Sequence, residues 1–413
     1  MRRDSVQIDD IFPLFSPRCW RRIRRRGAVV ALCLLMAASL AGCDRFRPRQ
    51  HEYVYVSARE VYLRDRVAAV SNRVALVKNG QRLEVLEHGR RFYKVTTDDG
   101  RIGWLQDHTI LDQQEFDKYQ QLANNHAQDP VVATAQLRDD LYLHLTPGRQ
   151  TDHFYLLPGN SHVKLLVRAS IPHVVPGAVP TPAAKDAQQA AAPPPMEDWW
   201  LVRDDKGDTG WLLGSRVDVD IPDAIGEYAE GQRMMAAYPL ATVMDDGHAP
   251  RAERRRKGRE PQTAGRQAAA TDTADAAPAT PTRETEYLVL LASPQSGLPY
   301  DFDQMRVFTW SLNHHRYETA YRLRGFQGFF PVRFSQETVD GATEPAFAFR
   351  IAGAAGSVID PQTGIAHPLS MRTVSFRLEG NILRRTGADQ GPIETHSTDG
   401  SEKPHHAAAH KRR

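Results

Sequence analysis

The chain is poor in cysteine, which occurs at three of its 413 positions, and all three (Cys19, Cys33 and Cys43) lie near the N-terminus. Residues 44–413 therefore offer no disulfide, no thiol nucleophile and no cysteine ligand for zinc. Long apolar runs are scarce as well. The uncharged stretch at 27–42 has 16 residues, fewer than the ~20 that span a bilayer comfortably.

The sequence also lacks the common catalytic motifs. It has no Gly-Lys pair of a phosphate-binding loop, no His-Glu-x-x-His and no Gly-x-Ser-x-Gly. Carboxylate pairs occur at Asp98-Asp99 and Asp204-Asp205, but both flank glycine turns, where we expect solvation rather than the burial that general acid–base chemistry needs. We therefore predict that the chain is not an enzyme and has no catalytic residue, no metal site and no cofactor.

Charge is distributed unevenly along the chain. Residues 1–26 hold eight Arg and three Asp, a net charge of +5, whereas residues 43–413 have a net charge of −2. A second basic cluster, Arg254–Lys257, has no aromatic side chains interleaved with it. The overall charge of +3 is thus poor support for nucleic-acid binding, and we predict no nucleic-acid partner.

The N-terminus has the layout of an export signal. The basic cluster Arg21–Arg26 precedes the apolar run 27–42, and Leu40-Ala41-Gly42-Cys43 resembles a bacterial lipobox. The resemblance implies that residues 1–42 are a lipoprotein signal peptide, that Cys43 is lipidated, and that 43–52 form a tether. The chain would then be a membrane-anchored lipoprotein of the cell envelope, facing the periplasm. The alternative is a plain signal anchor with a coincidental cysteine.

Short alternating strands separated by glycine turns begin at Tyr53, which indicates a mainly β fold. Part of this pattern is repeated at an offset of 107 residues. The segment from Tyr93-Lys94-Val95 to Gly103-Trp104-Leu105 recurs from Trp200-Leu201-Val202 to Gly210-Trp211-Leu212, and each copy precedes a helical pattern. We therefore predict two small β-barrels, each followed by a short helix.

The strand order, the Asp-x-Gly turn and the Gly-Trp-Leu segment resemble bacterial SH3 (SH3b) domains. The resemblance implies a first SH3b-like module with its helix at 53–126 and a second, more divergent one at 131–241. An Ala/Pro-rich stretch at 176–197 reads as a disordered insertion in the second module.

Beyond these modules, a segment with strand patterns lies between two segments that are poor in large apolar side chains. Residues 245–285 are poor in large apolar side chains and read as a disordered linker. Strand patterns return at 286–386, which predicts a third, all-β domain, and residues 387–413 read as a disordered tail.

Aromatic side chains in the two modules are the candidate ligand-binding residues, because aromatic faces bind sugars and peptides. The competing interpretation is that the Gly-Trp-Leu tryptophans pack the barrel cores. The candidates are Tyr55, Tyr62, Tyr93 and Trp104 in the first copy, and Tyr142, Trp200 and Trp211 in the second.

The resemblance implies a lipid-anchored envelope protein that uses tandem SH3b modules to bind peptidoglycan or a wall-associated protein, with the lipid on Cys43 as its contact with the membrane. Two alternatives stay open. The first alternative is that the chain is a scaffold or accessory subunit of an envelope protein complex. The second, which the missing motifs favour less, is that it is a hydrolase with its site in the C-terminal domain.

Overall fold

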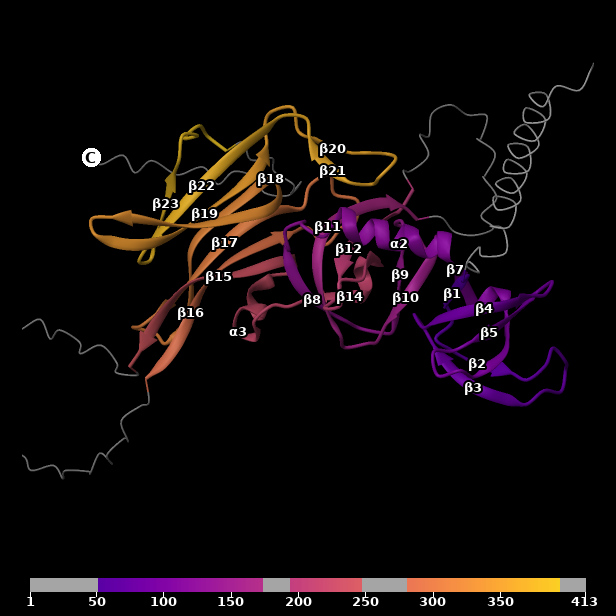
Figure 1. Cartoon of the computed structure of the whole chain (residues 1–413). Coiled ribbons are helices and arrows are strands. Elements are labelled where there is room, and N and C mark those ends of the chain that lie inside the picture. Colours follow the sequence, from indigo (N-terminus) through magenta and orange to yellow (C-terminus); the bar gives the residue numbers. More distant parts are fainter. Residues whose placement is uncertain (1–50, 174–193, 247–280, 394–413) are drawn as a thin grey trace, which may run out of the picture. The chain divides into compact units, whose positions relative to one another are not determined.

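A computed structural model describes residues 51–173, 194–246 and 281–393 of the chain. These residues form a mainly β structure of several antiparallel sheets, as the sequence predicts (Figure 1). The expected signal peptide at 1–42 and Cys43 lie outside the described residues. Within the described residues no helix is long and apolar enough to cross a membrane.

Module 1 is a seven-stranded sheet followed by a helix. Its strands run in the order β3-β2-β6-β5-β4-β1-β7. Their bounds are β1 Tyr53–Val56, β2 Glu60–Arg64, β3 Arg73–Lys78, β4 Arg82–His88, β5 Phe92–Thr96, β6 Ile102–Gln106 and β7 Ile110–Asp112. Helix α2 (Gln113–Asn125) follows directly, because the Asp112 carboxylate caps it by accepting from the Glu115 N–H.

Module 2 repeats this topology strand for strand, in the order β10-β9-β13-β12-β11-β8-β14. Its strands are β8 Ala133–Leu137, β9 Leu141–His144, β10 His153–Leu157, β11 His162–Pro172, β12 Met196–Arg203, β13 Thr209–Leu213 and β14 Val217–Val219. A matching glycine shows the equivalence. A Cβ on Gly103 would lie 2.7 Å from Leu63 Cβ, and one on Gly210 would lie 2.6 Å from Leu143 Cβ.

The C-terminal domain is a seven-stranded meander (Figure 1), with strands β15-β16-β17-β18-β19-β22-β23 in that order. The bounds are β15 Arg233–Asp245, β16 Thr282–Ala292, β17 Phe302–Ser311, β18 Arg316–Val339, β19 Ala342–Ala352, β22 Met371–Glu379 and β23 Ile382–Thr386. A short hairpin, β20 (Ser357–Ile359) with β21 (Ala366–Pro368), is inserted between β19 and β22.

Several segment boundaries differ from the sequence-based expectation. The helix after module 2 is short, α3 (Asp223–Gly226) and one 3-10 turn, and β15 then pairs with β16 along its length. The C-terminal sheet therefore begins at Arg233, and the expected linker keeps strand structure at both of its ends. These ends form strands despite their low apolar content, because β15 and β16 pair with each other and their side chains alternate between the two faces of the sheet.

Two further boundaries move. Residues 196–197 of the expected insertion belong to β12, where Met196 pairs with Pro172 of β11. The expected tail begins with ordered residues, because Asp389 accepts hydrogen bonds from Arg372 at 2.7 and 2.9 Å, and this lowers the pKa of Asp389 to about 2.

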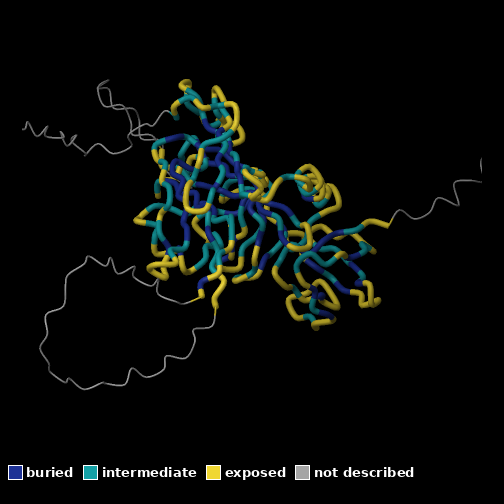
Figure 2. The backbone as a smooth tube through the Cα atoms, turned by 90° about the vertical axis from the view of Figure 1, so that its left-hand side faces the viewer, coloured by how far each residue is buried: buried dark blue, intermediate teal, exposed yellow. Residues whose placement is uncertain are grey.

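Module 2 and the C-terminal domain share one hydrophobic core rather than standing as separate domains. Trp200 and Leu212 of module 2 belong to the same buried cluster as Phe302 and Phe349 of the C-terminal sheet, whereas module 1 has a core of its own. Figure 2 shows buried residues in the interior of the fold and exposed residues mainly along its outer loops.

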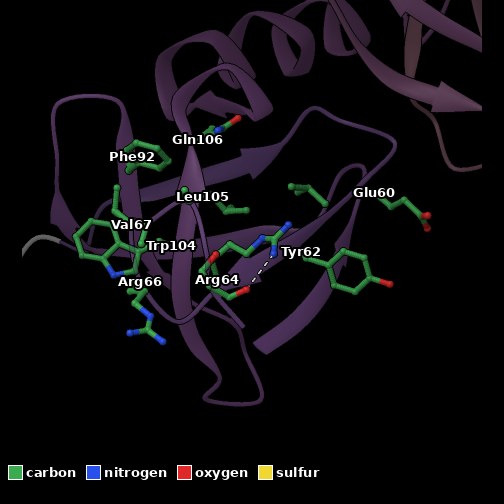
Figure 3. Close-up of a pocket in the computed structure, with 13 residues that line it drawn as sticks. Glu60, Tyr62, Arg64, Arg66, Val67, Phe92, Trp104, Leu105 and Gln106 are labelled. Carbon is green, nitrogen blue, oxygen red and sulfur yellow. Dashed lines mark hydrogen bonds between the residues drawn. The ribbon is translucent and has the colours of Figure 1, made fainter. Parts of the chain in front are cut away.

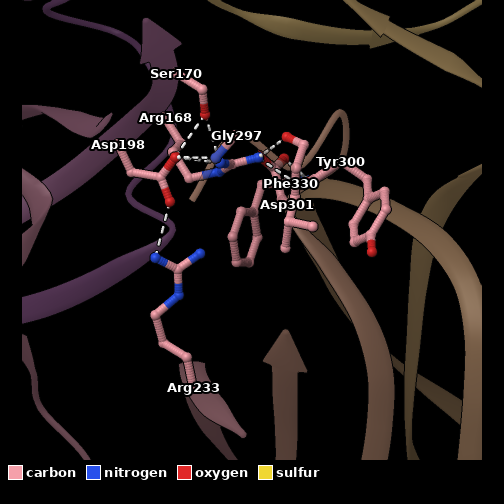
Figure 4. Close-up of polar contacts among 9 residues, drawn as sticks. Arg168, Ser170, Asp198, Arg233, Gly297, Tyr300, Asp301 and Phe330 are labelled. Carbon is pink, nitrogen blue, oxygen red and sulfur yellow. Dashed lines mark hydrogen bonds and ion pairs between the residues drawn. The ribbon is translucent and has the colours of Figure 1, made fainter. Parts of the chain in front are cut away.

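A buried charge cluster lies where module 2 meets the C-terminal domain (Figure 4). Arg168 and Asp198 are 4% and 5% exposed and their side chains are 3.1 Å apart. Arg168 also donates to the carbonyl oxygens of Leu298 and Tyr300, and Arg233 donates to Asp198 at 2.8 Å. Burial pushes the pKa of Asp198 upward, but the charges of Arg168 and Arg233 outweigh it, so that its pKa is lowered.

Asn79 connects module 1 to module 2. Its side-chain amide donates to the carbonyl oxygens of Ser57 and Phe154 at 2.8 and 2.9 Å, and its oxygen accepts from the Leu156 N–H at 2.9 Å. The side chain of Asn79 thus forms hydrogen bonds with main-chain groups of both modules, Ser57 in module 1 and Phe154 and Leu156 in module 2, and it links the two.

We predict that Asp198→Ala lowers the free energy of unfolding by about 3–5 kcal/mol, because Arg168 and Arg233 both lose the buried carboxylate that they share and Arg168 keeps only the longer 3.5 Å pair with Asp301. Asp218→Ala is the matched control. It breaks an exposed pair with Arg138 and should cost at most about 1 kcal/mol. Denaturant unfolding followed by tryptophan fluorescence measures both. Equal losses for the two variants would contradict a structural role of the buried cluster.

Candidate functional site: an aromatic and cationic groove on module 1

A groove with a volume of about 750 Å³ lies across β2, β6 and the loop at 65–72 (Figure 3). Tyr62 stands near one end, and Trp104, Val67 and Phe92 gather at the other. Strands β2 and β6 approach closely at Gly103, because its missing side chain makes room for the Leu63 Cβ and the Arg64 backbone. Trp104, the next residue, is then turned outward into the groove.

The loop at 65–72 is held in place as one wall of the groove. The Asp65 carboxylate accepts from the backbone and the side-chain nitrogen of Asn72, both at 2.9 Å, and this lowers the pKa of Asp65. Arg64 donates to the Ser71 carbonyl oxygen at 3.3 Å. The wall is therefore preorganised, which reduces the entropy lost when a ligand binds.

A second hollow of about 550 Å³ adjoins the first and shares Val67, Phe92 and Trp104 with it. Its remaining lining includes Arg90 and Arg91. The two hollows together form one surface, called here the groove, with Phe92 and Trp104 between its two lobes.

Cations surround the aromatic residues of the groove. The Arg73 guanidinium lies 4.4 Å from the centre of the Tyr62 ring, and Lys94 Nζ lies 5.8 Å from that of Trp104. Arg90 and Arg91 are exposed and form no ion pair with the residues that the structure describes. The acids nearby are Glu60, Asp65 and Glu87, and Glu87 is 3.7 Å from Lys94. The cationic side chains are Arg64, Arg66, Arg73, Arg90, Arg91 and Lys94, so positive charge exceeds negative.

Comparison with known families identifies the part of the chain that carries this groove. The family model of the bacterial SH3 domain matches residues 60–110, from the start of β2 to the start of β7. Residues 60–110 are a bacterial SH3 domain.

Whole-chain comparisons add little to this. The solved structures of NlpC2 and NlpC1 from Trichomonas vaginalis are similar at 9% and 10% sequence identity, with TM-scores of 0.14 and 0.15. The alignments cover 44% of this chain and 54% of NlpC2, and 66% of this chain and 88% of NlpC1. The chain thus spans about half the length of NlpC2. No curated protein matches the sequence.

The structure brings two of the predicted aromatics together at the SH3 groove, Tyr62 and Trp104. Tyr93 is half-buried, packs against the core of the SH3 domain and lies edge-on to His88. Tyr55 is turned away from the groove. It is 9% exposed, stacks on Phe116 of α2 with ring centres 3.6 Å apart, and donates to Gln113. Tyr55 is therefore a packing residue, which corrects the sequence-based expectation.

In module 2 the predicted tryptophans are buried. Trp200 is 5% exposed in the core shared with the C-terminal domain, 6.4 Å from Phe330 between ring centres. Trp211, at the position of Trp104, is 7% exposed. These two are also corrected to packing residues. Tyr142, at the position of Tyr62, is half-buried against His153.

The equivalent groove of module 2 is filled by other parts of the chain. Trp211 packs in one cluster with Trp199, which takes the place of Phe92, and with Leu122 of α2 and Ile365 of the β20–β21 hairpin. The hairpin is fixed there, because the Ser170 N–H donates to the Gly364 carbonyl oxygen at 2.7 Å. One SH3-like groove is thus open and the other is occupied.

The sequence reasoning missed Phe92 and the groove arginines. The signal for them was present, since Arg90 and Arg91 directly precede Phe92 at the start of a strand. No group of three or more His, Cys, Asp or Glu side chains suited to a metal ion occurs in the described parts of the chain.

We predict that substitution of two of the aromatics changes stability by very different amounts. Trp200→Ala removes a buried ring and should lower the free energy of unfolding by about 3–5 kcal/mol. Tyr62→Ala removes an exposed ring and should change it by about 0.5 kcal/mol or less. Urea unfolding of both variants measures this. A large loss for Tyr62→Ala would show that Tyr62 is a packing residue too.

Proposed function

We propose that the protein is a lipid-anchored binding protein of the cell envelope and that its SH3 domain binds peptidoglycan through the groove. The observation that carries this proposal is the groove on a bacterial SH3 domain that Tyr62, Phe92 and Trp104 line together with Arg90 and Arg91, two arginines without an ion pair among the described residues. The proposal assigns no catalysis to the chain.

The chemistry of the groove fits a wall fragment in two respects. Sugars and peptides present apolar faces that pack on aromatic rings, while the carboxylates of wall peptides are attracted to guanidinium groups. The excess of positive charge also concentrates an anionic polymer near the groove and raises its association rate.

In this proposal module 2 is a support rather than a second binding module. Its groove is occupied by Leu122 and Ile365, and its core is continuous with that of the C-terminal domain. One open groove per chain means that binding strength depends on a single site, with the membrane anchor restricting the search to the wall above the membrane.

We predict that the full chain, purified in detergent, pellets with peptidoglycan sacculi at low salt, and that Tyr62→Ala and Arg91→Glu each weaken this binding about tenfold or more. The first change removes a stacking surface, and the second reverses a charge that has no ion-pair partner among the residues that the structure describes. Arg91→Glu should also flatten the salt dependence.

Leu86→Ala is the matched control, because Leu86 is 46% exposed on β4 of the same domain and does not line the groove. A wild-type chain that stays in the supernatant would overturn wall binding and favour the scaffold alternative, in which the ligand is an envelope protein. Equal weakening by Leu86→Ala would overturn the assignment of the groove.

Anchoring is tested at Cys43, where the sequence Leu40-Ala41-Gly42-Cys43 supports lipidation. We predict that Cys43→Ala abolishes incorporation of labelled fatty acid, whereas Cys33→Ala, in the expected signal peptide, leaves incorporation unchanged in the mature chain. Incorporation that survives Cys43→Ala would contradict the lipoprotein proposal.

A further inference from the structure

A second hollow suited to a ligand lies away from the groove, beside helix α2. It has a volume of about 410 Å³ and is called here the α2 cavity. Module 1 contributes Ser57 and His108, the helix contributes Glu115, Lys118 and Tyr119, and module 2 contributes residues from Tyr142 to His153.

Tyr119 is the unusual residue of the α2 cavity. It is 2% exposed, yet its hydroxyl has no hydrogen-bond partner among the described residues. A buried hydroxyl without a partner is destabilising, because it has lost its hydrogen bonds to water and gained none in return. The ring itself is well packed, 5.6 Å from the ring centre of Phe154, so packing explains the ring and leaves the hydroxyl unexplained.

The carboxylates of Glu115 and Asp152 line the α2 cavity together with Tyr119. Burial raises the pKa of Tyr119, and the charges of Asp152 and then Glu115 raise it further. Neither carboxylate forms an ion pair within the described part of the chain, and both line the α2 cavity. Lys118 lines the α2 cavity as well and contributes one positive charge to it.

The remaining titratable neighbours are histidines. His108 lies 3.6 Å from Asp107, and the ring of His153 is tilted by 60° against that of Tyr142, with ring centres 4.8 Å apart. With neutral histidines the α2 cavity has two negative groups and one positive group, so its net charge is −1. This sign is opposite to that of the groove, and the two sites therefore select different ligands.

We propose that the α2 cavity binds a primary alkylammonium group. Such a group has three donors, which match the Tyr119 hydroxyl oxygen and the carboxylates of Glu115 and Asp152. Charge assistance makes these hydrogen bonds strong, and the Tyr142 ring is available for a cation–π contact. The ammonium belongs either to a free diamine or to a diamino-acid side chain of a peptide.

The experiment is calorimetric titration of the full chain in detergent with cadaverine and, separately, with an Nα-acetyl-lysine amide. Binding of both ligands, or of the lysine amide alone, assigns a peptide side chain as a source, and binding of cadaverine alone assigns a free diamine. Tetramethylammonium, which has no N–H donor, should bind at least about tenfold more weakly.

Three variants sharpen the test. Tyr119→Phe and Asp152→Asn should each weaken cadaverine binding about tenfold, since each removes one acceptor. Tyr119→Phe should also leave the melting temperature of the unliganded chain unchanged or raised, because no protein partner is lost. Asp117→Asn is the control, on the same helix, bonded to Gln113 and outside the α2 cavity.

No heat with either amine would overturn the proposal, and so would unchanged cadaverine binding in both Tyr119→Phe and Asp152→Asn. The groove variant Tyr62→Ala should bind cadaverine like the wild type. Failure at the α2 cavity is therefore separable from failure of wall binding at the groove.

Discussion

The structure depends on a buried pairing of charges between Arg168 of β11 and Asp198 of β12. Two ions removed from water are costly unless their remaining donors and acceptors are satisfied. Here the satisfying groups come from elsewhere, namely Arg233 at the start of β15 and the carbonyl oxygens of Leu298 and Tyr300. Module 2 and the C-terminal domain thus share the polar contacts of this pair, Arg168 Nε lies 3.5 Å from Asp301 Oδ1 as a second ion pair, and the shared hydrophobic core surrounds the cluster.

This constraint explains why two modules of one topology have different roles. In module 2 the outward positions are covered by α2, by the β20–β21 hairpin and by the C-terminal sheet, so Trp211 becomes part of a core. In module 1 nothing described covers the corresponding surface, and Trp104 stays at a groove between arginines. The two copies of the repeat therefore have the same strands, but in module 2 the surface that corresponds to the groove is buried by internal packing.

Charged side chains are also distributed unevenly between the groove and the α2 cavity. The chain beyond residue 42 has a net charge of −2, yet the groove gathers cations and the α2 cavity gathers carboxylates. A modest total charge thus contains two local fields of opposite sign. In the proposed function the cationic groove meets the anionic wall, and the α2 cavity provides a second, differently charged contact beside it.

The sequence by itself determined the mainly β class, the repeat and the bacterial SH3 resemblance, because alternation, glycine turns and the Gly-Trp-Leu segment are local features. It also pointed to Tyr62 and Trp104. Only the tertiary structure decided that Tyr55, Trp200 and Trp211 are buried, that residues 233–245 belong to the last sheet, and that Arg90 and Arg91 flank the groove. These outcomes depend on which distant strands and hairpins cover a surface, and a side chain's local pattern is the same whether its outward face meets water or another part of the chain.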